Sequence, residues 1–295
     1  ITLKLNAQQT AQYSNFIANS LYYNPSLVGF DDGAVLKTGH RAQWSGFDGS
    51  PKTTFASLSS VTNNNKINNP NYFRFGGYFQ SEVIGPYKSS LINIAVSYDL
   101  EIQRNLFFGF GLFGGFKQFG VDATKINLSQ PSDPLIRGSG KMFLFPDFSL
   151  GLSLKSKNWF IALSAKQMFN SDWSKLIGSS SSVDQVHYHL LFGKRINKGK
   201  FYFQPNVLIS KTKIGNPEIN INLNVGINDS FSSGLSIRNT NAIIALFNFK
   251  ILNVINLYYS YDLTTSKLRN ASINTHEIML GIKTGTSKPF NQTKQ

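Results

Sequence analysis

The sequence predicts an all-β fold, a transmembrane outer-membrane β-barrel, and three observations lead to this class. Many short segments alternate between apolar and small polar residues, as strands with one lipid-facing and one water-facing side do. The chain contains 25 Phe and 12 Tyr, yet only 15% of its residues are charged. Short turns are interspersed with longer connections, as in outer-membrane barrels. The 295 residues fit one large barrel.

The clearest strand is EININLNVGI, residues 218–227, where Ile219, Ile221, Leu223 and Val225 share one face and three Asn share the other. A turn at 228–229 joins it to FSSGLSIR, and the two form a predicted hairpin. The same pattern gives about 14 strands in all, an even number as expected for a bacterial barrel. They lie near residues 35–40, 54–61, 72–79, 91–98, 106–116, 143–154, 159–167, 186–192, 200–210, 218–227, 231–238, 242–249, 257–261 and 276–283.

The polar face of these strands separates a membrane barrel from a soluble sandwich or propeller. A soluble sheet carries many Lys, Glu and Asp on its outer face, whereas these positions hold mainly Asn, Ser, Gly and Thr. Aromatic residues flank the apolar stretches, as in the two interfacial girdles of a membrane barrel. They are Trp159, Tyr188, Tyr259, Tyr261, Phe201 and Phe249. The absence of any apolar run of about 18–20 residues excludes a helical membrane protein.

The spacing of the turns supports the barrel. Short turns are expected at residues 155–158, 197–200 and 238–241, and longer gaps at 126–141 and 168–184. The formal charge is +14, which raises nucleic acid as a partner. The cations are scattered, however, and the densest group, GKRINKGK at 193–200, has the pattern of a hairpin turn. We therefore expect no nucleic-acid partner.

Catalytic and metal chemistry find little support in the sequence. His187 and His189 lie two apart and share a strand face, so they are either half of a metal site or two lumen-facing polar residues. GFGLFGGF at 109–116 superficially suggests a phosphate loop, but its aromatics favour strand glycines that a neighbour approaches closely. The chain has no cysteine and no G-x-S-x-G motif. The sequence predicts no enzyme, no cofactor and no metal.

Three regions are expected along the chain: an N-terminal segment at 1–33, the barrel at 34–285 and a tail at 286–295. Residues 1–7 are either a signal-peptide remnant or the result of trimming by a tag or protease. Tyr22, Tyr23, Asn24 and Pro25 cannot continue a helix or a central strand, because Pro25 lacks a donor and biases Asn24 to extended geometry. We therefore expect this segment to pack as a plug or lid.

Four ordered motifs resemble one protein family. They are QYSNFIANSLYYNPSLVG at 12–29, RAQWSGFDGSPKT at 41–53, SYDLTTSKL at 260–268 and HEIML at 276–280. In this order they resemble the PorP/SprF family of outer-membrane proteins of Bacteroidota, which are associated with type IX secretion and gliding motility. The likeness runs over nearly the whole chain. Where many members have M-F-N before the NP, this chain has Phe16-Ile17-Ala18-Asn19. This difference leaves the barrel assignment unchanged, and we expect it to bear on partner choice.

The resemblance implies a barrel without enzyme activity that partners a large secreted adhesin. Such an adhesin carries a type B C-terminal domain, and the barrel supports its export and holds it at the cell surface for gliding and adhesion. It also implies contacts with periplasmic type IX components, and the excess of cations favours contact with lipid phosphates, lipopolysaccharide or an acidic adhesin domain. The rival hypotheses are a porin-like channel with a cationic lumen and a soluble β-rich binding module.

The motifs supply the candidate plug and partner-binding residues. Trp44 and Phe47 are expected to anchor an apolar contact, Gly46 and Gly49 to allow a sharp turn, and Arg41 to pair with Asp48 or an acidic group of the N-terminal segment. This block either closes the barrel or docks the adhesin. The full set is Tyr22, Tyr23, Asn24, Pro25, Gly29, Arg41, Gln43, Trp44, Gly46, Phe47, Asp48, Gly49 and Pro51, with Tyr261, Asp262, His276 and Glu277 near the C-terminus.

Overall fold

The alternating segments form long strands in the computed structural model of the chain. The structure describes residues 11–30, 34–46, 48–61, 72–122, 142–169, 185–213, 215–239, 241–251, 254–266, 269 and 274–284. Two short helices precede the strands, α1 (Ser20–Tyr23) and η1 (Pro25–Leu27). The strands are β1 (Ala34–Ser45), β2 (Lys52–Val61), β3 (Tyr72–Ile84), β4 (Tyr87–Gln103), β5 (Leu106–Val121), β6 (Met142–Ser156), β7 (Trp159–Lys166), β8 (His187–Lys194), β9 (Ile196–Lys198), β10 (Phe201–Thr212), β11 (Glu218–Ile227), β12 (Phe231–Arg238), β13 (Ala242–Ile251), β14 (Ile255–Thr264) and β15 (Asn274–Thr284).

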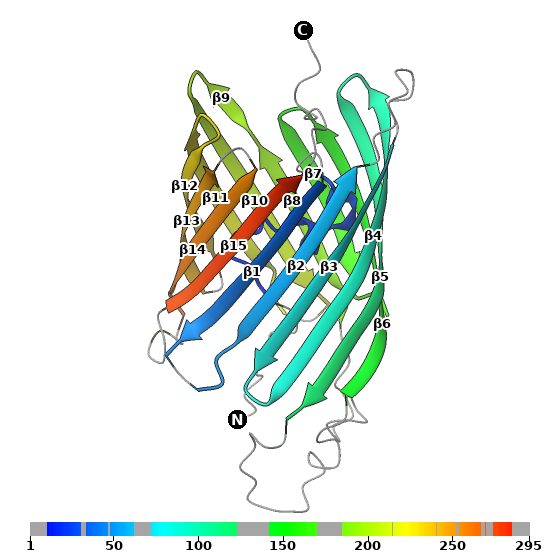
Figure 1. Cartoon of the computed structure of the whole chain (residues 1–295), viewed down its shortest axis with the longest axis vertical. Coiled ribbons are helices and arrows are strands. Elements are labelled where there is room, and N and C mark those ends of the chain that lie inside the picture. Colours follow the sequence, from blue (N-terminus) through cyan, green and yellow to red (C-terminus); the bar gives the residue numbers. More distant parts are fainter. Residues whose placement is uncertain are drawn as a thin grey trace, which may run out of the picture.

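The strands pair with their neighbours in chain order, and β1 pairs with β15, so the sheet closes on itself (Figure 1). β8 and the short β9 both pair with β10 and therefore share one position in the wall. Pairing of β10 with β11 completes the ring. The result is a closed antiparallel barrel with 14 strand positions, which confirms the predicted fold class and strand number. Closure leaves no unpaired sheet edge along the ring, a requirement for a sheet in lipid.

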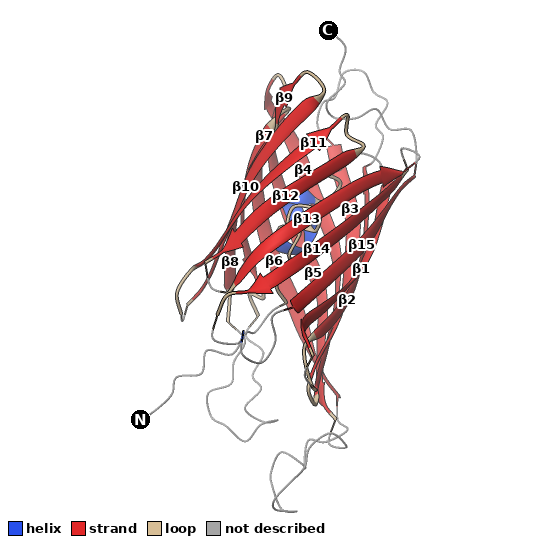
Figure 2. Cartoon of the chain, turned by 90° about the vertical axis from the view of Figure 1, so that its left-hand side faces the viewer, coloured by secondary structure: helices blue, strands red, loops and turns tan. Residues whose placement is uncertain are grey.

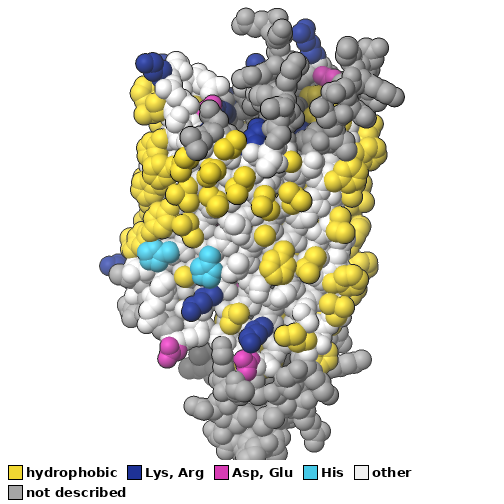
Figure 3. All heavy atoms as spheres, in the orientation of Figure 1, with side chains coloured by type: hydrophobic (Ala, Val, Ile, Leu, Met, Phe, Trp, Pro, Cys, Tyr) yellow, Lys and Arg dark blue, Asp and Glu magenta, His cyan; other side chains and the backbone are white. Residues whose placement is uncertain are grey.

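The two faces of the wall differ as the period of two predicts. On β11, the side chains of Ile221 and Leu223 point outward and are 58% and 48% exposed. The side chains of Asn220, Asn222 and Asn224 point into the barrel and are buried. Figure 3 shows the outer consequence, because apolar side chains cover the strands while charged ones gather toward the two ends. Lipid is the solvent that suits this outer face.

The connections form two sets because successive strands run in opposite directions. At the short-turn end, the upper end in Figure 1, they are residues 62–71, 104–105, 157–158, 199–200, 228–230 and 252–254. At the long-loop end they include 122–141 and 167–186, which agrees with the expected alternation. One expected short turn, at 238–241, lies at the long-loop end instead, because β12 runs toward that end.

The predicted aromatic positions divide between the two ends of the wall. Phe201 and Tyr188, at the starts of β10 and β8, are each 50% exposed. Rings placed at both rims suit the headgroup regions of a bilayer. The two groups are Trp159, Phe201 and Phe249 toward the short-turn end, and Tyr188, Tyr259 and Tyr261 toward the long-loop end.

The N-terminal segment, residues 11–30, precedes β1 and lies inside the barrel, where Figure 2 shows its helical part behind the strands. It supplies half of the larger buried apolar cluster, including Tyr13, Phe16 and Leu27. Among the described residues, no helix is long and apolar enough to cross a membrane. The predicted signal remnant at 1–7 and the tail at 286–295 lie outside the described residues.

Candidate functional site

The N-terminal segment has the local geometry that its Asn-Pro motif dictates. α1 ends at Tyr23, and Asn24 is extended, with φ −148° and ψ 117°. Pro25 cannot donate a backbone hydrogen bond, so the helix cannot continue through it. The Asn24 side chain instead accepts a hydrogen bond from the backbone N–H of Ser26 at 2.9 Å and thereby caps η1. This confirms the predicted break in the segment.

The Asn-Pro motif rests on two wall glycines, Gly111 on β5 and Gly151 on β6, which are partners in the strand register and are called the glycine seat. A Cβ added at Gly111 would lie 2.5 Å from the carbonyl carbon of Pro25. One at Gly151 would lie 2.8 Å from Pro25 Cδ. Only glycine therefore lets the segment approach this part of the wall. The Asn24 amide also donates to the backbone oxygens of Leu152 (3.2 Å) and Leu163 (2.9 Å).

Two carboxylates, one on β14 and one on β15, bind the start of the segment and are called the carboxylate pair. Glu277 on β15 accepts hydrogen bonds from the backbone N–H groups of Ser14 (2.8 Å) and Asn15 (3.1 Å). Asp262 on β14 accepts from the Ser14 hydroxyl at 2.5 Å. Arg41 lies between the two carboxylates, 3.0 Å from Asp262 and 3.2 Å from Glu277. All three charged side chains are almost fully buried, so their mutual pairing is what makes their burial possible.

Arg238 extends this network along the lumen wall. Its Nη1 lies 3.5 Å from Asp262, and its Nη2 donates to the backbone oxygen of Tyr13 at 3.2 Å. Its Nε lies 3.8 Å from Glu218, which also accepts a hydrogen bond from the Gln12 side chain. The wall thus binds both N–H and C=O groups at the start of the segment.

A second charged cluster holds the end of the segment. Asp99 on β4 pairs with Arg74 at 2.7 Å and with Lys155 at 2.5 Å. Lys155 Nζ also donates to the backbone oxygen of Ser26 at 3.1 Å, and Arg74 donates to that of Gly29. Gly29 has a φ of 65°, a conformation that favours glycine. These contacts fix the chain just before it enters β1.

Two more wall side chains bind carbonyl groups in the middle of the segment. Lys37 Nζ donates to the backbone oxygen of Ala18 at 2.7 Å, and the Ser164 hydroxyl donates to that of Tyr23 at 2.6 Å. Carbonyl groups without a regular sheet or a long helix need such partners when they are buried. The polar lumen is therefore matched to the backbone of this segment along its length.

Aromatic packing adds an apolar contact at the centre of the lumen. The Tyr13 ring meets Tyr22 and Phe55 edge-on, with centroids 4.8 Å away in both cases. Its hydroxyl donates to Gln80 at 2.9 Å and accepts from Tyr78 at 2.8 Å. Burial raises the pKa of the Tyr13 phenol well above its usual value, so the ring stays neutral and can donate.

The β1–β2 block RAQWSGFDGSPKT forms a turn at the long-loop end. Gly46 and Gly49 have φ values of 123° and 78°, as the predicted sharp turn requires. Trp44 is half-buried and has a φ of 52°. Gln43 donates its backbone N–H to the oxygen of Pro51 at 2.9 Å. The role of this turn in docking stays a prediction.

The expected partner of Arg41 needs correction. Arg41 was expected to pair with Asp48 or with an acidic group of the N-terminal segment, but it pairs with Asp262 and Glu277. The reason is the alternation of the strand, which points Arg41 into the lumen opposite Glu277, whereas Asp48 is exposed in the turn. Phe47 lies outside the described residues.

The C-terminal motif residues split between the two faces of the wall. Asp262 and Glu277 point inward to Arg41, while Tyr261 and His276 point away from the lumen, with ring centroids 5.3 Å apart. Tyr261 and His276 are partners in the strand register. The motif therefore combines one lumen contact with one outer contact.

His187 and His189 both face the lumen with stacked rings, 6.2 Å between centroids. His189 Nδ1 lies 2.9 Å from the Ser210 hydroxyl, and the Tyr23 ring meets its edge. The part of the chain that the structure describes holds no group of three or more His, Cys, Asp or Glu that could bind a metal ion.

Sequence reasoning missed most of the wall side of this site. The run GFGLFGGF signalled a close approach, and Gly111 shows that the neighbour is the Asn-Pro motif. A second signal was available, because the alternation places several charged residues on the inward faces of strands, where they need partners. These missed residues are Arg74, Asp99, Lys155 and Arg238.

The closed wall, apolar outside and polar inside, defines an integral β-barrel protein of the outer membrane. The family model described as type IX secretion system membrane protein PorP/SprF matches residues 5–282, and the chain belongs to that family. This confirms the resemblance seen in its motifs.

Solved barrels share the fold at low sequence identity. The Acinetobacter baumannii outer membrane protein Omp33 is 8% identical, with 85% of this chain and 98% of that chain covered and a TM-score of 0.50. The CymD monoaromatic hydrocarbon channel is 11% identical, with 92% and 93% covered and a TM-score of 0.54. No curated protein matches the chain.

Proposed function

We propose that this barrel is a non-enzymatic partner of a cognate adhesin secreted by the type IX system. In this proposal it supports export of the adhesin and anchors it, through a type B C-terminal domain, at the cell surface for gliding and adhesion. Membership of the PorP/SprF family supports a role in secretion. The adhesin itself is inferred from the family resemblance of the motifs.

The observation that carries the proposal is the occupied lumen. Wall side chains bind the backbone of residues 13–29 at both ends and in the middle, through contacts such as Lys155 to Ser26 and Arg238 to Tyr13. A segment held this firmly acts as a plug, and a plugged barrel is suited to holding a protein rather than to passing solutes. The rival function, a porin-like channel with a cationic lumen, requires the same space to be open.

Copurification and conductance together test the proposal. The tagged protein is extracted in mild detergent from its native outer membrane, and proteins that accompany it are identified by mass spectrometry. We expect a very large secreted protein in near-equal amounts and almost no conductance after reconstitution into a planar bilayer. Recovery of the barrel alone, together with open-channel conductance, would overturn the proposal in favour of the porin.

We further propose that the turn after β1 docks the adhesin. Long loops face the cell exterior in outer-membrane barrels, and Trp44 and Asp48 lie at that end. Trp44→Ala is expected to leave the barrel folded and to reduce the adhesin recovered with it. If this variant folds and the full amount of adhesin is still recovered with it, the turn is not part of the docking surface.

A further inference from the structure

We propose that a cationic cavity at the short-turn end of the lumen binds an acidic peptide segment of a partner protein. This inference goes beyond the proposed function, because it concerns the opposite end of the barrel from the adhesin. Short turns face the periplasm in outer-membrane barrels, so the peptide enters from that side. We call this cavity the basic vestibule.

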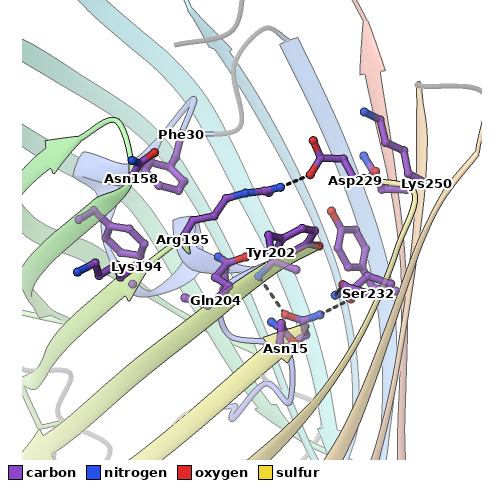
Figure 4. Close-up of a pocket in the computed structure, with 18 of the residues that line it drawn as sticks. Asn15, Phe30, Asn158, Lys194, Arg195, Tyr202, Gln204, Asp229, Ser232 and Lys250 are labelled. Carbon is purple, nitrogen blue, oxygen red and sulfur yellow. Dashed lines mark hydrogen bonds and ion pairs between the residues drawn. The ribbon is translucent and has the colours of Figure 1, made fainter. Parts of the chain in front are cut away.

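The basic vestibule has a volume of about 390 Å³ and lies between the N-terminal segment and the strand ends (Figure 4). Asn15 and Phe30 of the segment contribute to its lining, so the plug forms one wall. A second cavity of about 320 Å³ shares Lys157, Arg195 and Tyr202 with it and continues to the β9–β10 hairpin. The two cavities therefore adjoin each other at the short-turn end.

The charge of the basic vestibule is strongly one-sided. Its lining includes six cationic residues and a single acidic residue, Asp229. The cations come from separate strands and turns, and only Lys194 and Arg195 belong to the dense group at 193–200. They are Lys37, Lys157, Lys194, Arg195, Lys250 and Lys283. Low-dielectric walls concentrate the field of such a set and attract anions.

Asp229 shows how the basic vestibule recognises a carboxylate. Its side chain pairs with Arg195, whose guanidinium also lies 3.8 Å from the centroid of the Tyr202 ring (Figure 4). Arg195 Nε donates to Asn197 at 2.9 Å, which fixes the guanidinium beside the β9–β10 hairpin. Asp229 lies in the turn between β11 and β12. A carboxylate of the protein itself therefore already pairs with Arg195 in the lining of the basic vestibule. A carboxylate of a partner can take its place.

A peptide suits this lining better than a lipid headgroup or a free anion. The cavity is lined in part by the N-terminal segment inside the barrel, whereas lipids meet the outer wall. Its cations come from several strands and turns, and its lining also includes amides such as Gln204 and Asn224 and aromatic rings such as that of Tyr202. Such a surface offers partners to a backbone as well as to carboxylates.

Fluorescence anisotropy tests the inference on the full chain in detergent. The probe is a short labelled peptide of alternating Glu and Gly, and its counterpart carries Lys in place of Glu. We expect saturable binding of the acidic peptide that weakens with added salt. The double variant Lys250→Glu/Lys283→Glu should weaken it about tenfold or more, because two attractive contacts become repulsive. Lys157→Glu/Lys194→Glu serves as a second, independent variant.

The matched control is Lys52→Glu/Lys213→Glu, which makes the same change of net charge at exposed positions of the long-loop end. It should leave the affinity within about twofold. Equal weakening by both double variants would overturn the inference, because it would mean attraction by net charge alone. Displacement of the peptide by inorganic phosphate at an equal anion concentration would also overturn it, since the site would then take small anions.

Asp229→Asn adds a readout of opposite sign. It frees Arg195 from its internal partner, and Asn tolerates the positive φ of 58° at this position. Binding of the acidic peptide is expected to tighten about threefold or more, since one competing carboxylate is lost. Weaker binding would contradict the role assigned to Arg195.

Discussion

At the scale of single residues, the lack of a side chain at Gly111 allows the Asn-Pro motif to contact the wall. Gly111→Ala places a methyl group against the backbone of Pro25 and Ser26. We expect the stability of the seated segment to fall by about 1–3 kcal/mol, the usual effect of overpacking. Chemical denaturation followed by the mobility of the folded and unfolded barrel on gels measures this change.

Gly114→Ala is the control on the same strand. A Cβ at Gly114 meets nothing within 4 Å, so its effect should stay within about 0.5 kcal/mol. Equal losses in the two variants would mean that strand propensity, not the seat, accounts for the effect at Gly111.

Arg41 pairs with two buried carboxylates, so its loss leaves buried charge without a partner. Arg41→Ala leaves Asp262 and Glu277 buried side by side, with Arg238 as the remaining nearby cation for Asp262. Removing one partner of a buried ion pair typically costs about 3–5 kcal/mol, and we expect a loss of that order in the same denaturation measurement.

Lys88→Ala provides the exposed counterpart. Lys88 pairs with Asp122 at 3.3 Å, but its side chain is 46% exposed, so its removal should change stability by about 0–1 kcal/mol. If Arg41→Ala were as mild as Lys88→Ala, the carboxylate pair would not be the main anchor of the segment.

At the scale of elements, the N-terminal segment is expected to stay inside the barrel in solution. The chain has no native cysteine, so single cysteines report accessibility directly. Ser20→Cys lies in the buried α1, whereas Asn197→Cys lies in the exposed β9. A membrane-impermeant maleimide should label position 20 at about one tenth of the rate at position 197, or more slowly still. The reason is that labelling at position 20 requires local opening of the structure. Equal rates would mean that the segment leaves the lumen freely.

The elements themselves were largely predictable from the sequence, because a strand between lipid and a polar lumen must alternate. EININLNVGI shows this within ten letters. The partners of each element were not predictable. Arg41 meets Asp262 and Glu277 across 221 and 236 residues of sequence, through the closing contact of β1 with β15 and the next strand. Likewise, the glycines of β5 indicated that another part of the chain approaches closely, but not which segment does so.

At the scale of the whole molecule, the N-terminal segment connects parts of the wall that are not neighbours. It contacts β5 and β6 at the glycine seat, and β14 and β15 at the carboxylate pair. A unit held at both ends can transmit the loss of one contact to the other. Substitutions at distant sites normally add within about 0.5 kcal/mol, so a departure from additivity would reveal this connection.

A double-mutant cycle between Gly111→Ala and Arg41→Ala measures that coupling. If the segment leaves the wall as one unit, the first substitution already releases it, and the second then removes contacts that no longer exist. The combined loss should therefore be smaller than the sum of the two single losses by about 0.5–3 kcal/mol. The cycle of Gly114→Ala with Arg41→Ala should be additive, because Gly114 does not contact the segment. Additivity in both cycles would mean that the two ends are held independently, and that a partner could displace one end of the segment while the other stays in place.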